Sequence, residues 1–460
     1  MYVRLLLLSC MAACSSLERG SPAADPDTRV LVIGAGAAGL TAAQVLHTAG
    51  VEVTVLEARH RIGGRVWTAD VGAATVDLGG AWLHGTRGNP TADFFDANGL
   101  DYVPDRTRWT VLFDEAADQA LGDPGWEVME DAYRDFPRAA PGLRSRLGAG
   151  ADLADARAQW ISDEGLTGQA ARLATHAIDQ WLVELSYAGP VDEVGLATFW
   201  REGELAGGDQ FPIGGYGRWI TALADDLDIV LDHPVSAVDW RGDEVVVQAG
   251  GERFVGTHVI VTVPVGVLQA GVIDFEPDLP RRKRTAVDRM DRGNLEKVVL
   301  VWDEPWWSGS IEFVDATGSG RFPEFYDMSE LAGAPTLVGL YGGRFAREVQ
   351  ATWSDEAIVA GALEVLATTH GRELPAPSHT AVTHWTTDPF SGGSYLFLPP
   401  GATFDDIDAL AEPAGPRLMF AGEATDRRHY GNVHAAVMSG LREAHRLGVK
   451  RIAVPGWEDW

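Results

Sequence analysis

The chain has 460 residues, of which 46% are hydrophobic and 22% charged, so it is long enough for about two to four domains and too apolar to be wholly disordered. Its 66 acidic and 37 basic residues give a net charge of −29, which argues against a nucleic-acid-binding surface and suits cationic small molecules. Its two cysteines, Cys10 and Cys14, lie near the N-terminus, which excludes a disulfide framework, a zinc–thiolate site and an iron–sulfur cluster in the rest of the chain.

Residues 1–14 have the layout of a secretory signal peptide. Arg4 precedes an apolar run over residues 5–13, which is far shorter than the roughly 20 residues of a membrane-spanning helix. The run leads into MAAC, which is similar to a bacterial lipobox and makes Cys14 a candidate lipid anchor. Residues 15–28 are rich in Ser, Pro, Ala and Asp and predict a solvated tether. We therefore expect an exported protein, either secreted or a cell-envelope lipoprotein; the alternative is the frayed N-terminus of a cytoplasmic protein.

The body of the chain begins with a strand, a glycine-rich turn and a helix. Residues 29–33 (RVLVI) form a short β-branched run that predicts a buried strand, and residues 40–49 predict a helix that stops at Gly50. Residues 51–56 (VEVTVL) predict a second strand, closed by Glu57. This order of elements predicts a dinucleotide-binding site.

Each residue of the glycine-rich turn has a separate physical role in binding a dinucleotide. Gly34 permits the tight turn, Gly36 lets the backbone approach a pyrophosphate, and Gly39 lets the helix and the strand pack closely. The N-terminus of the helix offers free N–H donors to the phosphates. Glu57 follows Gly36 by 21 residues (57 − 36) and is placed to accept hydrogen bonds from ribose hydroxyls, which favours FAD or NAD over NADP.

A basic, glycine-containing stretch follows at 58–65 (ARHRIGGR). Its glycines let the backbone pass close to a ligand, and Arg59 and Arg65 are candidates to neutralise a pyrophosphate; the alternative is a basic surface loop. The stretch DLGGAWLHG comes next, at 77–85.

The motif EARxRxGGR at 57–65 resembles the flavin-dependent amine oxidases, the family of monoamine oxidases, polyamine oxidases and lysine-specific histone demethylases. The resemblance recurs in order along nearly the whole chain. It covers QFPIGGYGRWITALADDL at 210–227, HPVSAVDW at 233–240, HVIVTVPVGVLQ at 258–269, NLEKVVLVW at 294–302, HWTTDPFSGGSY at 384–395 and FAGEATDRRHYGNVHAAVMSGLREA at 420–444. GAWLHG followed by GNP at 88–90 most resembles animal spermine and acetylpolyamine oxidases and their bacterial relatives.

The resemblance implies FAD as the cofactor, which we expect to be bound non-covalently, and we expect no metal. Some relatives attach the flavin through a cysteine in SGGC, but Ser394 stands at that place here. By resemblance, the backbone of Val235 holds the adenine, and Glu423 binds hydroxyls on the ribitol or pyrophosphate side. The implied cofactor-binding residues are Gly34, Gly36, Ala38, Gly39, Glu57, Ala58, Arg59, Gly64, Arg65, Gly80, Ala81, Trp82, Leu83, Val235, Trp385, Gly422, Glu423 and Val433.

The order of the motifs predicts an α/β protein with two interleaved domains. Residues 29–90, 212–284 and 385–455 are assigned to a Rossmann-like FAD-binding domain. Residues 91–211 and 285–384 are assigned to an α+β substrate-binding domain that carries an antiparallel sheet.

Hydrophobic periodicity gives a coarse view of the elements. In the substrate-binding domain, residues 166–185 have helical spacing, whereas the runs at 298–302, 311–314 and 336–341 predict strands. Near the C-terminus, residues 433–447 predict an amphipathic helix whose positive N-terminal end would face the flavin pyrimidine.

The resemblance also singles out candidate catalytic residues. Lys297 matches the lysine that holds a water against flavin N5 and assists the reaction with O2; the alternative is a strand-edge lysine. Tyr395 matches the first aromatic wall of an amine-binding cage, or else is a core tyrosine. The second wall is usually Tyr or Thr, but Asn432 stands at that position, unless Tyr430 or His429 takes its place.

His84 is the fourth candidate. Its position is occupied by histidine in animal polyamine oxidases and by an acid in some plant enzymes. Near pH 7 a histidine is able to take up a proton or to hydrogen-bond a substrate nitrogen. The alternative is a buried histidine bonded to the backbone.

These residues predict an FAD-dependent amine oxidase that converts a small-molecule amine and O2 to an imine or aldehyde and H2O2, with polyamines as the favoured substrates. One alternative is an L-amino-acid oxidase of the same superfamily, for which no motif identifies an arginine clamp. Another is a non-catalytic cell-surface protein that keeps FAD for structure. The sequence shows no long charged helical insertion of the histone demethylase kind, so chromatin and nucleic acid are not expected partners. The oligomeric state stays open.

Overall fold

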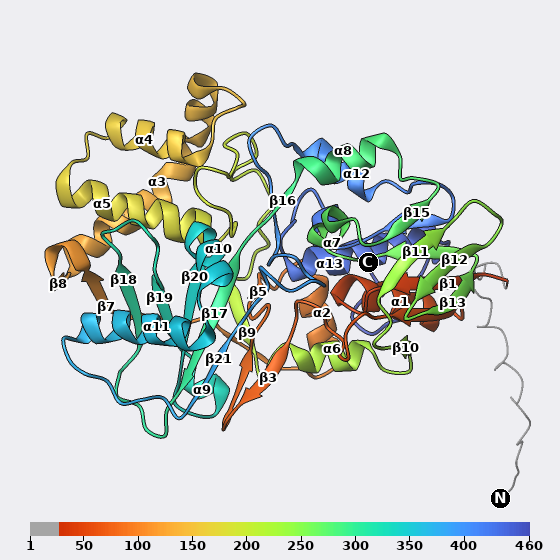
Figure 1. Cartoon of the computed structure of the whole chain (residues 1–460), viewed down its shortest axis with the longest axis horizontal. Coiled ribbons are helices and arrows are strands. Elements are labelled where there is room, and N and C mark those ends of the chain that lie inside the picture. Colours follow the sequence, from red (N-terminus) through yellow and green to blue (C-terminus); the bar gives the residue numbers. More distant parts are fainter. Residues whose placement is uncertain (1–26) are drawn as a thin grey trace, which may run out of the picture.

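The computed structural model describes residues 27–460, which form two lobes side by side (Figure 1). The signal peptide, the Cys14 anchor and most of the tether lie outside the described residues, so they stay predictions. Among residues 27–460, no helix combines the length and the apolar character needed to cross a bilayer.

The first lobe is built on a five-stranded parallel sheet with the strand order β10–β2–β1–β14–β23. Residues of β1 alternate between two hydrophobic clusters: Val30 and Val32 are buried on one face, and Leu31 and Ile33 on the other. The run RVLVI is apolar throughout because both faces of its strand are covered. The strands are β1 (Arg29–Ile33), β2 (Glu52–Leu56), β10 (Asp228–Val230), β14 (His258–Val261) and β23 (Leu418–Phe420).

Helices α1 (Ala37–Thr48) and α13 (Val433–Arg446) cover one face of this sheet and pack closely on each other. A Cβ atom on Gly440 would lie 2.6 Å from the carbonyl oxygen of Ala38, so the contact requires glycine. The other face is covered by a second sheet, in the order β13–β12–β11–β15, and by two helices. These elements are β11 (Val235–Asp239), β12 (Val245–Ala249), β13 (Glu252–Gly256), β15 (Asp274–Glu276), α8 (Arg281–Arg289) and α12 (Phe404–Ala411).

The second lobe contains a seven-stranded sheet in the order β21–β17–β20–β19–β18–β7–β8. It differs from the predicted antiparallel sheet at one pair, because β7, from an earlier segment of the chain, joins β18 in parallel. The other pairs are antiparallel. The strands are β7 (Trp109–Asp114), β8 (Gln119–Ala120), β17 (Leu295–Val301), β18 (Ser310–Val314), β19 (Glu324–Asp327), β20 (Thr336–Gly342) and β21 (His379–Val382).

The two faces of this sheet have different partners. Val298 and Leu300 of β17 pack into the cluster under α10 (Gly343–Thr352) and α11 (Asp355–His370). Val299 alternates with them and packs with Val76 and Leu78, on the side of the first lobe. Lys297 has the same parity as Val299, so its side chain lies on the face that meets the first lobe.

The helical segment predicted over residues 166–185 is two elements. Helix α5 (Gly168–His176) continues into a π-helical stretch, η2 (Ala177–Glu184). A π-helical turn is wider than an α-helical one and is frequent at functional sites. Helices α3 (Asp123–Leu147) and α4 (Leu153–Asp163) pack beside α5, at the upper left of Figure 1.

The remaining elements are short. They are β3 (Thr68–Val71), β4 (Ala74–Asp77), β5 (Leu83–His84), α2 (Pro90–Ala97), β6 (Tyr102–Pro104), η1 (Glu115–Ala117), β9 (Asp209–Pro212), α6 (Gly217–Leu223), α7 (Val265–Ala270), β16 (Asp291–Arg292), α9 (Ser329–Ala332), β22 (Leu396–Phe397) and η3 (Glu423–Thr425).

Replacing Lys283 by Met should destabilise the fold by about 2 kcal/mol. The buried Lys283 ammonium donates to the carbonyl oxygens of Ala409, Leu410 and Glu412, at 3.0, 2.5 and 2.6 Å, and so satisfies the C-terminal end of α12. Methionine fills a similar volume but leaves these carbonyls without their donor. Urea unfolding of the holoprotein measures the change, with the exposed Lys450→Met as the matched control. Equal midpoints for the two variants would contradict the capping role.

Candidate active site

The carboxyl edge of the parallel sheet gathers the glycines predicted to bind the dinucleotide. Gly34 follows β1 with a φ of +105°, a conformation that favours glycine. A Cβ atom on Gly39 would lie 2.0 Å from the carbonyl oxygen of Gly34, so only glycine lets α1 start this close to β1. Gly36 is the N-cap of α1 and has no side chain to occupy the first N–H groups of the helix.

The same edge has the space and the hydrogen-bonding groups that a dinucleotide requires. A Cβ atom on Gly36 would meet nothing nearer than the Gly63 carbonyl oxygen at 4.0 Å, so the backbone borders an open slot. Glu57 is buried, and its carboxylate accepts hydrogen bonds from the N–H groups of Ala35, at 2.7 Å, and Arg59, at 2.9 Å. These bonds orient the carboxylate and leave lone pairs for ribose hydroxyls. The residues present therefore fit the FAD that the sequence predicts.

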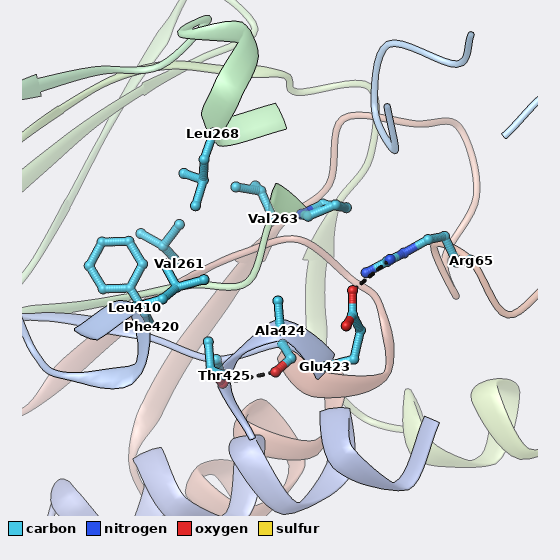
Figure 2. A pocket seen from close by; sticks show the side chains of 12 residues that line it. Arg65, Val261, Val263, Leu268, Leu410, Phe420, Glu423, Ala424 and Thr425 are labelled. Carbon is cyan, nitrogen blue, oxygen red and sulfur yellow. Dashed lines mark hydrogen bonds and ion pairs between the residues drawn. The ribbon is translucent and has the colours of Figure 1, made fainter. Parts of the chain in front are cut away.

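Both arginines predicted to neutralise the pyrophosphate are paired with carboxylates from distant segments. Arg59 donates two hydrogen bonds to Asp388, at 2.6 and 2.7 Å. Arg65 donates to Glu423 at 2.9 Å and to the carbonyl oxygen of Ser394 at 2.8 Å, and its guanidinium points at the Glu423 carboxylate in Figure 2. The contacts tie three segments of the chain together; contact of either arginine with the pyrophosphate stays a prediction.

Two of the remaining predicted cofactor residues are glycines with open space or a neighbouring glycine beside them, and the roles of the others stay predictions. Gly64 lies beside Gly36, because a Cβ atom on it would be 3.4 Å from the Gly36 Cα. Gly422 follows β23 with a φ of +135°, and a Cβ atom there would meet nothing within 4 Å. Ala38 lies in the first turn of α1, Ala58 follows Glu57, Ala81 and Leu83 are buried on either side of Trp82, and Val235 starts β11.

A backbone strip from Asp77 to Gly80 is held by residues from distant segments of the chain. The indole N–H of Trp385 donates to the Leu78 carbonyl oxygen at 3.0 Å. A Cβ atom on Gly79 would lie 1.9 Å from the Arg65 carbonyl oxygen, so only glycine allows this path. Gly80 faces α13, where a Cβ atom would lie 3.2 Å from a methyl group of Val433.

Lys297 holds the same strip from β17. It is 6% exposed, and its Nζ donates to the carbonyl oxygens of Asp77 and Gly79, each at 2.8 Å. Burial lowers the pKa of Lys297 to about 8, and the nearby Asp77 carboxylate opposes this change. Nζ also lies 5.6 Å from the centre of the Trp82 ring. Lys297 is therefore a buried amine and not a snorkelling strand-edge residue, and its position beside the flavin stays a prediction.

Of the predicted cage residues, Tyr395 has its ring fixed by two contacts, and its role as an aromatic wall stays a prediction. The Tyr395 hydroxyl donates to the Leu185 carbonyl oxygen at 2.8 Å, and its ring lies against Gly431, where a Cβ atom would be 3.5 Å from Cδ2. Asn432 follows as the N-cap of α13, with its amide donating to two carbonyl oxygens of the preceding turn. The rings of the two alternatives point elsewhere. Tyr430 packs on Phe404 in the core and His429 packs on His434.

His84 lies at the rim of the site. Its side chain is 49% exposed, and its Nδ1 lies 3.0 Å from an Asp209 carboxylate oxygen on the paired strand β9. The alternative of a buried histidine bonded to the backbone is therefore wrong. The contact with His84 lowers the pKa of Asp209, so this pair presents a carboxylate near the rim.

Two buried glutamates, which the sequence analysis missed, share the sheet face of Lys297. Leu340 of β20 is paired with Lys297 on one side and with Glu324 on the other, and Glu324 is paired with Glu312. Paired residues of antiparallel strands point to the same face, and neighbouring strands lie about 4.8 Å apart. The backbone positions of Glu324 and Glu312 are therefore about 10 and 14 Å from that of Lys297.

Neutral groups surround these two carboxyls. Nε2 of His176 lies 2.5 Å from a Glu312 oxygen, Trp181 of η2 donates to the other oxygen at 3.4 Å, and Tyr326 hydrogen-bonds Glu324. Burial raises the pKa of both glutamates well above the usual range, and burial lowers the pKa of His176 to about 4. The site therefore holds two carboxyl groups whose ionised form a nearby cation would favour. Isolated glutamates in two strands carry no sequence signal of this pairing.

Aromatic rings connect the glutamates with the predicted flavin end. The Tyr326 ring meets the Trp82 ring edge-on at 5.3 Å between centres. On the other side, Trp181 lies 6.1 Å from the rings of both Trp126 and Tyr133, and Tyr133 is 41% exposed. Ring faces attract cations, so an ammonium group that reached these rings would be stabilised by them.

Comparison with known proteins places this site in a family. The sequence profile described as flavin containing amine oxidoreductase matches residues 37–448. The chain is 34% identical to lysine-specific histone demethylase 1 homolog 1 of Oryza sativa subsp. japonica, over 94% of this chain and 54% of that protein. It is 35% identical to protein FLOWERING LOCUS D of Arabidopsis thaliana, over 93% of this chain and 56% of that protein. The chain thus spans about half the length of these relatives.

This chain matches a larger share of a relative that is named for polyamine oxidation. "Probable polyamine oxidase 4" of Arabidopsis thaliana is 30% identical, over 90% of this chain and 85% of that protein. The sequence motifs most resemble polyamine oxidases, whereas the demethylase homologue and FLOWERING LOCUS D have the higher identities. The fold is that of a solved putrescine oxidase with putrescine bound, with a TM-score of 0.74, 23% identity, and 91% and 98% of the two chains covered.

The FAD should be released by acid precipitation. Ser394 offers no thiol for a flavin linkage, and the cysteines of the chain lie at positions 10 and 14. The yellow colour is expected in the supernatant after precipitation with trichloroacetic acid. Flavin fluorescence that stays with the washed pellet would show a covalent bond and contradict the prediction.

Proposed function

Because the chain belongs to the flavin containing amine oxidoreductases, we propose that it is an FAD-dependent oxidase of di- and polyamines. It would convert the amine and O2 to H2O2 and an imine, which water hydrolyses to an aldehyde. The observation that carries the polyamine assignment is the buried pair Glu312 and Glu324, on the sheet face of Lys297.

The two glutamates suit an ammonium group distant from the reacting nitrogen. Like charges directly opposite each other in a sheet are unfavourable, and a buried unpaired charge costs more, so without a cation the pair is held neutral. A distal ammonium placed between them would favour their ionised form and form charge-assisted hydrogen bonds. A monoamine carries no group to make this contact.

The chain's own residues have separate tasks in this reaction. Bound FAD supplies the hydride acceptor and passes the electrons to O2. The ring of Tyr395, fixed by its bond to Leu185, orients the reacting amine. Lys297 leaves one N–H free after its two bonds to the strip, and that donor would hold a water or O2 beside the flavin. The reacting nitrogen must be neutral, so the rate should rise with pH.

Two further observations support a polycationic substrate. The net charge of −29 attracts polycations over a long range and disfavours amino-acid carboxylates. The comparisons include a relative and a solved structure whose names refer to polyamine and putrescine oxidation.

A second candidate substrate is an N-methylated lysine side chain in a peptide. The identity of 34% to a lysine-specific histone demethylase homologue favours it. It carries one ammonium group near the reacting carbon and no second one that would reach the glutamates, so the buried pair argues for polyamines.

Glu324→Gln should lower kcat/KM for spermidine and spermine about 100-fold and leave benzylamine within about threefold, because only polyamines lose a charge-assisted hydrogen bond. Production of H2O2 is measured for both enzymes with spermine, spermidine, benzylamine, phenethylamine, a dimethyl-lysine peptide and L-amino acids. The exposed Glu364→Gln on α11 is the matched carboxyl-to-amide control.

In the wild type, a polyamine should have the highest kcat/KM of this panel. A preference for an aromatic amine, the peptide or an amino acid would refute the polyamine assignment. A glutamine variant that loses benzylamine and spermidine turnover equally would refute the role of Glu324.

Lys297→Met should slow the reaction of the reduced flavin with O2 about 100-fold or more while changing the substrate Kd less than about threefold, because a positioned charge near the flavin is lost. Stopped-flow mixing of reduced enzyme with O2 measures the rate of reoxidation. Flavin absorbance during an anaerobic titration with substrate measures the Kd. Lys450→Met is the remote control. An unchanged oxidative rate constant would contradict the assignment.

A further inference from the structure

Asp77 is a charged residue behind Lys297 to which the reaction described above assigns no task. It ends β4, and its carboxylate accepts a hydrogen bond from the Thr68 hydroxyl and from the Tyr216 N–H, which lies 3.0 and 3.2 Å from its two oxygens. The same residue's backbone carbonyl accepts a hydrogen bond from Lys297 Nζ. Asp77 thus joins β4, the turn before α6 and β17 at one point.

The neutral contacts of Lys297 make Asp77 its electrostatic partner. The two acceptors of its ammonium are carbonyl oxygens, which carry no net charge. Burial lowers the pKa of Lys297 to about 8, and the Asp77 charge acts in the opposite direction. Burial raises the pKa of Asp77 to about 6, while Thr68, Lys297 and Tyr216 act to lower it.

The other ionisable groups around the pair have partners of their own or are held neutral by burial, as are Glu324 and Glu312, farther along the same sheet face. The Glu296 carboxylate, on the opposite face of β17, accepts from Thr383 and from the N–H groups of Trp385 and Thr386. The guanidinium of Arg65 is bound to Glu423. The phenol of Tyr216 is buried, which raises its pKa, so it stays neutral.

We propose that Asp77 is a positioning residue that acts through Lys297, since its backbone carbonyl fixes the amine and its carboxylate keeps the amine protonated. The consequence for turnover rests on the proposed function, in which Lys297 assists the reaction with O2. An anion beside an amine favours the ammonium form, so removing it lowers the pH at which the amine loses its proton. The ammonium is present below pH about 8 in the native protein and should be lost at lower pH in Asp77→Asn.

The composition of the chain makes the titration of the Lys297 amine directly measurable. Of its 37 basic residues only Lys283, Lys297 and Lys450 are lysines, so ¹³C-lysine labelling gives three ε-carbon signals. Lys297→Met assigns the signal of interest. The titration of this signal requires neither substrate nor O2, so it tests the coupling even if the proposed function fails.

In Asp77→Asn the Lys297 signal should titrate at a pH about one unit lower than in the wild type. In the wild type it should also show a second, smaller step near pH 6, where Asp77 ionises. Asp406→Asn, which removes a buried carboxylate in the capping box of α12, is the matched control and should change neither step. An unchanged Lys297 titration in Asp77→Asn would overturn the proposal. Absence of the step near pH 6 in the wild type would also overturn it, and this measurement remains if the variant does not fold.

The rate of reoxidation by O2 gives the functional test. In this step O2 takes up two electrons from the reduced flavin, and two protons from the flavin and the medium, to form H2O2. The reoxidation rate should fall with rising pH, and this fall should begin about one pH unit lower in Asp77→Asn than in the wild type. In a Lys297→Met background the same replacement should add no further loss. A loss in Asp77→Asn that is equal at every pH, or that persists without Lys297, would show a merely structural role.

Discussion

The strip from Asp77 to Gly80 contacts both lobes at once, and the geometry of the site depends on these contacts. Its carbonyl oxygens accept hydrogen bonds from Lys297 of the second lobe and from Trp385. Its glycines let it pass close to Arg65 and Val433 of the first lobe. Because Lys297 belongs to β17, this attachment also fixes where the whole seven-stranded sheet lies relative to the cofactor path. The distance of the buried glutamates from the flavin end follows from the register of that sheet.

The interleaved chain explains why charge pairs reinforce the same junction. The first lobe takes its strands from segments that are more than 100 residues apart, so the strip alone cannot align them. The pair of Arg59 with Asp388 spans 329 residues and that of Arg65 with Glu423 spans 358. Each is at least half-buried, where screening by salt is weak. These arginines therefore align the walls of the cofactor path whether or not they also contact the pyrophosphate.

Sequence reasoning was accurate where function depends on local spacing. The glycine turn, Glu57 and the final helix are set by residues within a few positions of each other, and these elements lie within a few residues of where the sequence placed them. It was poor where function depends on pairing between distant strands. The parallel addition of β7 to β18, the partner of His84 and the alignment of Glu312 with Glu324 depend on sheet register, which a single sequence does not encode locally. Asp77 was visible as part of a motif, but its link to Lys297 crosses 220 residues.

The surface carboxylates and the buried glutamates of this protein act on a cation over different distances and with different consequences. The surface charge that dominates the net value of −29 is solvated and screened over about 8 Å at physiological salt, so it governs how often a polycation arrives. The buried Glu312 and Glu324 are held largely neutral until a cation reaches them, so they contribute little to the long-range field. Once a cation is bound, the low dielectric of the interior strengthens the contact. Under the proposed function, the surface field would favour more highly charged amines in general, whereas the buried pair would distinguish amines that carry a second ammonium group from monoamines, which have no group to ionise the two acids.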